Sequence, residues 1–301
     1  MARLRLGTRG SPLALRQAEE AAAALRVRDP GLDVEIVAIR TTGDRIRDRR
    51  LADIGGKGLF AKEIEAALAD GRIDAAVHSV KDLESALPES FVLAAMLERA
   101  DPRDGLAGGA RMLAELPPGA RVGTASLRRQ AQMLARRPDL VPALIRGNVE
   151  TRLERVRAGA FDATFLAMAG LARLGMAERA VPIAPEEMLP AAGQGAVGIE
   201  CRAGDHALRE RLAAIDHGPT SCCVTAERAL LAALDGSCRT PIAAHARLRS
   251  GELVLRGRLL TPDGAEMREV RRSGPAGDAL AIGLDAGEAL RAEAPPGALE
   301  A

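Results

Sequence analysis

The sequence predicts an α/β protein with two lobes, followed by a small α+β domain. Short apolar runs alternate with amphipathic stretches through most of the chain, the length of 301 residues exceeds that of one usual domain, and antiparallel strands are expected after Gly218. We therefore expect domain 1 at residues 1–98 with 196–216, domain 2 at 99–195, and domain 3 at 217–301.

Strands and helices alternate in the first lobe. Ser11 followed by Pro12 predicts a helix start, because a serine oxygen caps free N–H groups and proline suits the first helical position. The helix should run to about residue 25. Apolar runs predict strands near residues 4–6, 34–39, 75–77 and 92–95.

The same alternation recurs in the second lobe and changes in the third domain. Strands are expected near residues 121–123, 144–145 and 164–167, each followed by a helical stretch. In domain 3, we expect a helix over 221–234, a hairpin of 242–248 with 253–260, a helix over 278–292, and a frayed end over 293–301.

Composition excludes several function classes. The 42 Lys and Arg residues nearly balance the 41 Asp and Glu residues, so no global field attracts nucleic acid or an anionic membrane. Aromatic residues make up only 1%, which disfavours stacking on bases. The N-terminus carries no secretion pattern and no segment is apolar enough to cross a membrane, so a cytoplasmic protein is expected.

Three predicted strand-to-helix junctions place hydroxyl or guanidinium donors beside a helix N-terminus. Free N–H groups, a partial positive charge and arginine forks together suit carboxylate or phosphate groups. One such junction is more often only a capped helix with a surface arginine, whereas three together favour anion binding. The junctions contain Thr8, Arg9 and Ser11; Thr124, Ser126, Arg128 and Arg129; and Arg146, Asn148, Thr151 and Arg152.

A second group of candidates lies next to other predicted elements, ahead of a helix from Phe60 or at the end of a strand. "GGKG" at 55–58 supplies Lys57, but it lacks the spacing of a Walker A motif. "HSVKD" at 78–82 ends a strand and supplies Lys81 and Asp82, an acid able to hold N–H donors or a cation. His78 is more often a structural residue at such a position.

Cysteines give one candidate thiol and no metal site. Cys238 lies in the loop "LDGSCRTP", where Arg239 would favour the thiolate, although a buried inert thiol is the alternative. We expect Cys201, Cys222 and Cys223 to be packing residues. No spacing with the histidines indicates metal binding.

The residues alone thus indicate a basic cleft for a small polycarboxylate, with one acid and one loop thiol. Two alternatives remain at this stage. One is a non-enzymatic anion-binding or sensor protein, which would have no use for Cys238. The other is an enzyme acting on a phosphorylated substrate, since the same junctions suit phosphate.

Nine strings in order from residue 8 to residue 246 resemble the porphobilinogen deaminase family. They are "TRGSPLALRQA", "GGKGLFAKEIE", "DAAVHSVKDL", "RADPRDGL", "VGTASLRRQAQ", "RGNVETRL", "LAMAGLARLG", "AAGQGAVGIECR" and "TAERALLAALDGSCRTPIAAHA". So many motifs in one order are far more specific than a single glycine loop.

The resemblance implies two lobes like those of type II periplasmic binding proteins with a cleft between them, plus a small α+β domain that carries a cofactor cysteine. It implies a transferase of tetrapyrrole and heme biosynthesis. Four porphobilinogen molecules would be condensed head to tail on a dipyrromethane primer, with release of ammonia, and the product hydrolysed to hydroxymethylbilane. The family is usually monomeric.

The resemblance also implies residue roles. Cys238 would hold dipyrromethane through a thioether, and Asp82 would be catalytic, facing pyrrole N–H groups and stabilising positive charge as ammonia leaves. Phe60 and Gln194 match positions near the cleft, and no metal is required. The carboxylates of cofactor and substrate would be bound by Arg9, Ser11, Lys57, Lys81, Thr124, Ser126, Arg128, Arg129, Arg146, Arg152 and Arg173.

The sequence departs from the family pattern at three positions. Asp53 stands where lysine is common, Ala125 replaces a usual hydroxyl, and Glu84 replaces a usual proline. The first two should weaken anion binding, while Asp82, Cys238 and most of the arginine set are kept. We expect altered affinity or loop behaviour with activity retained.

Overall fold

The computed structural model describes residues 3–42, 61–235 and 240–299, which form two compact units. Unit 1 contains the described residues before Asp101 together with 195–221, and unit 2 contains 101–194 with the described residues from 222 onward. The proposed division into three domains stays a prediction.

Unit 1 is built on a five-stranded mixed sheet in the order β2-β1-β3-β10-β4. β1 is parallel to its neighbours β2 and β3, whereas β10 is antiparallel to β3 and β4. The strands are β1 (Arg3–Arg9), β2 (Asp33–Ile39), β3 (Ala75–Ser79), β4 (Phe91–Met96) and β10 (Val197–Arg202). The helices are α1 (Pro12–Arg28), α3 (Lys62–Ala69) and α7 (His206–Ala213).

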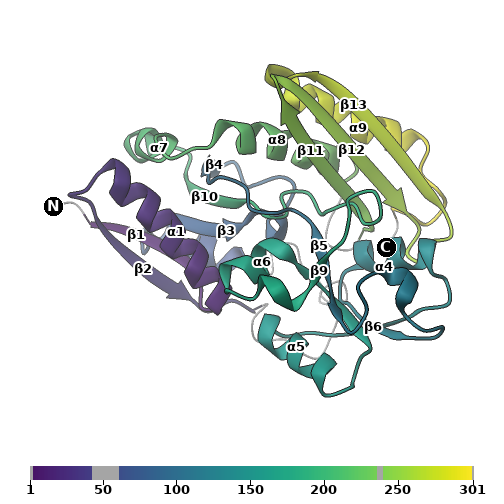
Figure 1. The fold of residues 1–301 in the computed structure, drawn as a ribbon. Helices are drawn as coiled ribbons and strands as arrows, with labels where there is room; N and C mark the ends of the chain where they lie inside the picture. Colours follow the sequence, from purple (N-terminus) through teal and green to yellow (C-terminus); the bar gives the residue numbers. More distant parts are fainter. Residues whose placement is uncertain (1–2, 43–60, 236–239, 300–301) are drawn as a thin grey trace. The chain divides into compact units, whose positions relative to one another are not determined.

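Helix α1 shows how the sequence forms unit 1. Its buried positions, among them Ala14, Ala18, Ala21 and Leu25, recur at helical spacing and so form one apolar stripe. The stripe shares one core cluster with Leu6 and Val77. Helix α1 lies against β1 and β3 of the sheet (Figure 1). The expected start is confirmed, since Ser11 caps the helix and proline occupies its first turn.

Unit 2 contains a second five-stranded sheet in the order β7-β6-β8-β5-β9. β6 is parallel to β7 and β8, and β5 is antiparallel to β8 and β9. The strands are β5 (Asp104–Gly108), β6 (Arg121–Gly123), β7 (Val141–Ala143), β8 (Ala163–Ala167) and β9 (Val181–Pro182). The helices are α4 (Leu127–Arg136), α5 (Val149–Arg157) and α6 (Met168–Arg173).

An antiparallel three-stranded sheet completes unit 2; the hairpin formed by its first two strands is as expected, whereas its third strand is not among the predicted elements. Its strands are β11 (Ile242–Arg249), β12 (Glu252–Leu260) and β13 (Met267–Pro275), in that order. Helix α9 (Ala279–Ala292) lies along one face of this sheet (Figure 1). The core beneath also receives Leu230 of α8 (Gly218–Ala233), a helix that the sequence places at 221–234.

Two expectations are wrong in detail. The strand expected at 144–145 lies at Val141–Ala143 instead, and Ile145 is apolar because it is fully buried beneath Gly123. The end of the chain is not frayed over 294–299: Pro295 is buried and Ala298 lies in the core with Leu290. No helix among the described residues is long and apolar enough to cross a membrane.

Candidate active site

In unit 1, Asp82 lies on a single turn directly after β3. The 3-10 turn Val80–Asp82 is anchored by the buried Val80, whose N–H donates to the Ala196 carbonyl at 3.1 Å. Because Ala196 directly precedes β10, the neighbouring strand fixes where the turn begins. Lys81 and Asp82 are half-buried beside it.

Arg9, the last residue of β1, faces Asp82. Its Nη1 lies 3.8 Å from Asp82 Oδ2, and the Asp82 side chain is 38% exposed, so the carboxylate can still accept N–H donors from a ligand. A cavity of about 60 Å³ opens at this end of the parallel strands. It is lined by Thr8, Arg9, Ser11, Leu13, Ala14, Gln17, Ala61, Val77, His78, Ser79, Asp82 and Leu83.

Hydrogen bonds hold the walls of this cavity. The buried Thr8 hydroxyl lies 3.2 Å from the Val77 carbonyl, to which it donates. Gln17 of α1 and Ser79 of β3 are hydrogen-bonded at 2.8 Å. The Ser11 oxygen accepts from the Ala14 N–H at 3.3 Å, which is the usual contact of a helix cap.

His78 has a partner in the sheet. Its Nε2 lies 2.8 Å from Glu200 Oε2, and both side chains are buried. This contact is the hydrogen-bonded structural arrangement that the sequence favours for His78.

A larger hollow of about 790 Å³ lies elsewhere in unit 1. Arg202, which lines it, ends β10, and the antiparallel register pairs that end of β10 with the start of β3. The hollow therefore lies at the opposite end of β3 from Asp82. Glu65 also lines it, and burial together with the charge of Glu200 raises the pKa of Glu65.

In unit 2, α4 starts from a hydroxyl-rich cap. The Ser126 oxygen accepts from the Arg129 N–H at 3.4 Å, and the Thr124 oxygen accepts from the Ser126 N–H at 3.1 Å. The predicted junction is therefore confirmed as a capped helix start. Ala125, which replaces a usual hydroxyl, sits between these two side chains.

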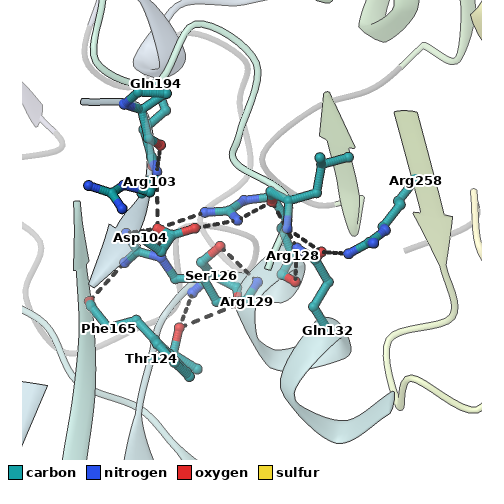
Figure 2. Close-up of polar contacts among 12 residues, drawn as sticks. Arg103, Asp104, Thr124, Ser126, Arg128, Arg129, Gln132, Phe165, Gln194 and Arg258 are labelled. Carbon is teal, nitrogen blue, oxygen red and sulfur yellow. Dashed lines mark hydrogen bonds and ion pairs between the residues drawn. The ribbon is translucent and has the colours of Figure 1, made fainter. Parts of the chain in front are cut away.

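Arg128 and Arg129, in the first turn of α4, both bind the carboxylate of Asp104 at the start of β5 (Figure 2). Arg128 Nη1 donates to Oδ2 at 2.7 Å and Nη2 to Oδ1 at 3.2 Å. Arg129 donates to Oδ1 from Nε at 2.9 Å and from Nη2 at 2.7 Å. All three side chains are buried, and Asp104 is 0% exposed.

Asp104 stays ionised in this setting. Burial alone would raise its pKa, but the charges and hydrogen bonds of Arg128 and Arg129 outweigh burial and hold the pKa far below its ordinary value. Gln194 also donates to Asp104 Oδ1, at 3.1 Å, and to the Pro102 carbonyl at 2.8 Å. Gln194, expected near a cleft, is thus a buried partner of Asp104.

A second set of contacts extends this cluster to β12. Gln132 of α4 clamps the Leu189 peptide, donating to its carbonyl at 3.0 Å and accepting from its N–H at 2.8 Å. Arg128 also donates to that carbonyl, at 2.8 Å, and Arg258 of β12 donates to Gln132 Oε1 at 3.1 Å (Figure 2). Hydrogen bonds to β5, to the Leu189 peptide and to β12 therefore fix the N-terminal half of α4 within unit 2.

The third junction is more exposed. Asn148 caps α5 and accepts from the Thr151 N–H at 2.9 Å, and Arg152 Nε donates to the Gly147 carbonyl at 2.9 Å. Arg146 and Arg173 are half-buried, the latter at the end of α6.

Several predicted residues fall outside the described ranges or lie apart from these sites. Lys57, Phe60, Cys238 and Asp53 lie outside the described residues. Cys201 and Cys223 are buried in apolar cores and Cys222 is half-buried, as expected for packing residues.

The sequence pattern does not single out Asp104 or Gln132 as site residues. The only signal was an acid next to an apolar stretch in "RDGLAG".

Two family models match the chain. "Porphobilinogen deaminase, dipyromethane cofactor binding domain" matches residues 4–210, and "Porphobilinogen deaminase, C-terminal domain" matches residues 221–292. The chain belongs to the porphobilinogen deaminase family. The predicted family, transferase activity and dipyrromethane cofactor are confirmed, and the sensor and phosphate-enzyme alternatives no longer apply.

Relatives in this family span nearly the whole chain. The chloroplastic porphobilinogen deaminase of Oryza sativa subsp. japonica is 50% identical over 98% of this chain and 85% of its own. The porphobilinogen deaminase of Paracoccus denitrificans (strain Pd 1222) is 52% identical over 97% and 95%.

Solved structures of binding proteins also match. The methionine-binding protein MetQ covers 71% of this chain and 89% of its own, with a TM-score of 0.45 and 14% identity. The L-cystine solute receptor of Neisseria gonorrhoeae covers 71% and 85%, with a TM-score of 0.40 and 16% identity.

Proposed function

We propose that Asp82 is the catalytic carboxylate of this porphobilinogen deaminase, and that the arginine-bearing junctions bind the carboxylates of its pyrroles. The reaction condenses four porphobilinogen molecules head to tail, releases ammonia from each, and ends when water hydrolyses the finished chain from the primer as hydroxymethylbilane. The observation that supports the proposal most is the accessible Asp82 carboxylate beside Arg9, in a cavity at the carboxyl end of β1 and β3.

Each condensation breaks one C–N bond and forms one C–C bond. The aminomethyl carbon of porphobilinogen loses ammonia and bonds to the free α-carbon of the preceding pyrrole, which then gives up its proton. Positive charge develops on the pyrrole as ammonia leaves. We propose that the Asp82 carboxylate accepts pyrrole N–H hydrogen bonds, stabilises this charge and assists the proton transfer.

The basic residues fit a ligand that carries carboxylates. Porphobilinogen bears an acetate and a propionate, so each unit added to the chain brings further negative charge. Dipyrromethane, when bound, supplies the pyrrole α-carbon on which the first condensation occurs. We propose that the carboxylates are bound by Arg9, Ser11, Lys57, Lys81, Thr124, Ser126, Arg128, Arg129, Arg146, Arg152 and Arg173.

We further propose that Cys238 carries the cofactor through a thioether, and that Phe60 and Gln194 contribute near the pyrroles. We propose a cytoplasmic monomer that binds neither nucleic acid nor membranes. The near-balance of 42 basic and 41 acidic residues supports the last point, because no global positive field is present.

Single-turnover kinetics of primed enzyme test the role of Asp82. With porphobilinogen added, Asp82→Asn should release ammonia about 10²–10⁴-fold more slowly than the parent while remaining folded and primed. Glu89→Gln, which changes an exposed carboxylate in the same unit, should react like the parent. An unchanged rate in Asp82→Asn would exclude Asp82 as the catalytic group.

A further inference from the structure

Asp104 joins two buried arginines that follow one another in the chain. The Arg128 and Arg129 side chains are 6% and 8% exposed, and Asp104 is 0% exposed. These three side chains carry two positive charges and one negative charge. Buried ion clusters of this kind stabilise a fold little more than apolar packing would. A gain in stability is therefore a weak reason for their presence.

The contacts fix the orientation of each guanidinium group. Arg129 places Nε and Nη2 on one Asp104 oxygen, and its Nη1 donates to the Phe165 carbonyl at 2.9 Å. Arg128 spans both Asp104 oxygens and donates to the Leu189 carbonyl (Figure 2). Each planar group is thus held at more than one point, and a free arginine side chain would lose about 2 kcal/mol of rotamer entropy when ordered. That ordering occurs on folding, before any ligand binds.

Asp104 also sets the charge of the cluster. It offsets one of the two guanidinium charges, so the three side chains together match one ligand carboxylate. Without Asp104, two like charges in the first turn of α4 would repel each other in a setting of low dielectric.

We propose that Asp104 is a positioning residue that prealigns Arg128 and Arg129 for a single pyrrole carboxylate. The inference rests on the proposed function of the two arginines as carboxylate ligands. Asp104 acts through them and touches neither cofactor nor substrate. Gln194, which donates to both Asp104 and the Pro102 carbonyl, holds the Asp104 carboxylate in turn.

A double-mutant cycle of Asp104→Asn and Arg128→Gln tests the proposal in the full-length enzyme. Intact mass gives the fraction of chains that carry the cofactor, and steady-state kinetics give KM for porphobilinogen and kcat. Each single variant should lower cofactor occupancy and raise KM by about tenfold or more, with a smaller change in kcat. In the double variant, the increase in KM should be about tenfold less than the product of the two single increases.

Leu113→Ala is the matched control. Leu113 is buried in the core of the same unit, and its truncation removes only apolar packing. This variant should lose stability with KM and occupancy unchanged at temperatures where it is folded. If Asp104→Asn does not fold, Asp104→Glu replaces it, since this change keeps the negative charge but shifts the carboxylate relative to the two guanidinium groups; a smaller rise in KM is expected, and an unchanged KM overturns the proposal.

The outcomes distinguish the proposed role of the arginines as carboxylate ligands from the proposed positioning role of Asp104. Unchanged KM and occupancy in Arg128→Gln would refute the proposed role of the arginines themselves. Suppose instead that Arg128→Gln is impaired but Asp104→Asn has a normal KM. This result would refute only the positioning role of Asp104. The same holds if the KM of the double variant rises by the product of the two single increases.

Discussion

His78 Nε2 and Glu200 Oε2 lie 2.8 Å apart inside the sheet of unit 1, and neither side chain is exposed by more than 6%. The contact joins β3, which leads to Asp82, with β10. His78 lines the same cavity as Asp82, but its Nε2 is already hydrogen-bonded to Glu200. We therefore infer that the His78–Glu200 contact stabilises the position of β3, the strand that leads to Asp82.

The first prediction concerns this pair. Glu200→Ala should lower the free energy of unfolding by about 1–3 kcal/mol, because His78 loses its buried partner. Glu200→Gln, which keeps an acceptor for His78, should lower it less. Urea denaturation measures both losses, and kcat of the folded variants should remain near that of the parent. A large fall in kcat in Glu200→Gln at unchanged stability would instead give the pair a chemical role.

The second prediction concerns acid stability. The pKa of Asp104 is lowered in the folded state, so its contribution is complete above the unfolded pKa of about 3.9 and is lost as the pH falls below that value. The difference in the free energy of unfolding between the parent and Asp104→Asn should therefore shrink between pH 5 and about pH 3. Denaturation at several pH values measures the difference.

The control for this experiment is Asp70→Asn, which changes an exposed carboxylate 3.5 Å from Arg72. Exposed pairs contribute little, so its difference from the parent should stay small and flat across the same range. A flat difference for Asp104→Asn as well would show that Asp104 is not ionised against the two arginines in the folded protein.

Features that depend on residues close together in the sequence are predicted correctly. The helix starts at Ser11, Ser126 and Asn148 are confirmed, because a cap depends on residues within three positions of one another. The turn between β11 and β12 is confirmed for the same reason: Ser250 and Gly251 adopt the positive φ values that a tight hairpin requires.

Contacts between distant residues could not be predicted in this way. The sequence indicates that Arg128 and Arg129 favour anions, but not that Asp104, more than twenty positions earlier, binds both. The sequence also predicts Ile145 in a strand, because a residue buried in a core and a residue buried in a sheet give the same apolar signal. The buried Ala298 follows two prolines and a glycine, a composition that is more typical of a free end.

The third prediction concerns the exposed junction. Arg146→Ala should slow chain elongation or cofactor assembly, because a ligand carboxylate would lose a charged partner. Arg155→Ala, which changes an exposed arginine on the same unit's α5, should have no effect. Separation of the enzyme species that carry successive pyrroles measures elongation, and normal progress in Arg146→Ala would remove Arg146 from the proposed site.

The fourth prediction concerns the turn that packs on α4. Gly264 has φ +73°, and a Cβ there would lie 2.4 Å from the Ala131 carbonyl oxygen and 2.6 Å from the Ala135 nitrogen. Gly264→Ala should therefore push the turn away from α4. Gly251→Ala is the matched control, with φ +82° and nothing within 4 Å of its Cβ.

Both variants strain the backbone by about 1–2 kcal/mol. Gly264→Ala should lose more stability than Gly251→Ala in urea denaturation, because only it creates a clash with helix backbone. Equal losses would show that the turn moves without disturbing α4.

Intact mass of the denatured protein tests the central claim most directly. The parent, purified from a heme-making host, should be heavier than its polypeptide by two pyrrole units, and Cys238→Ser should have the mass of the polypeptide alone. This result would establish both the covalent cofactor and its attachment residue. A bare parent that also gains no pyrrole mass and releases no ammonia on incubation with porphobilinogen would contradict the account.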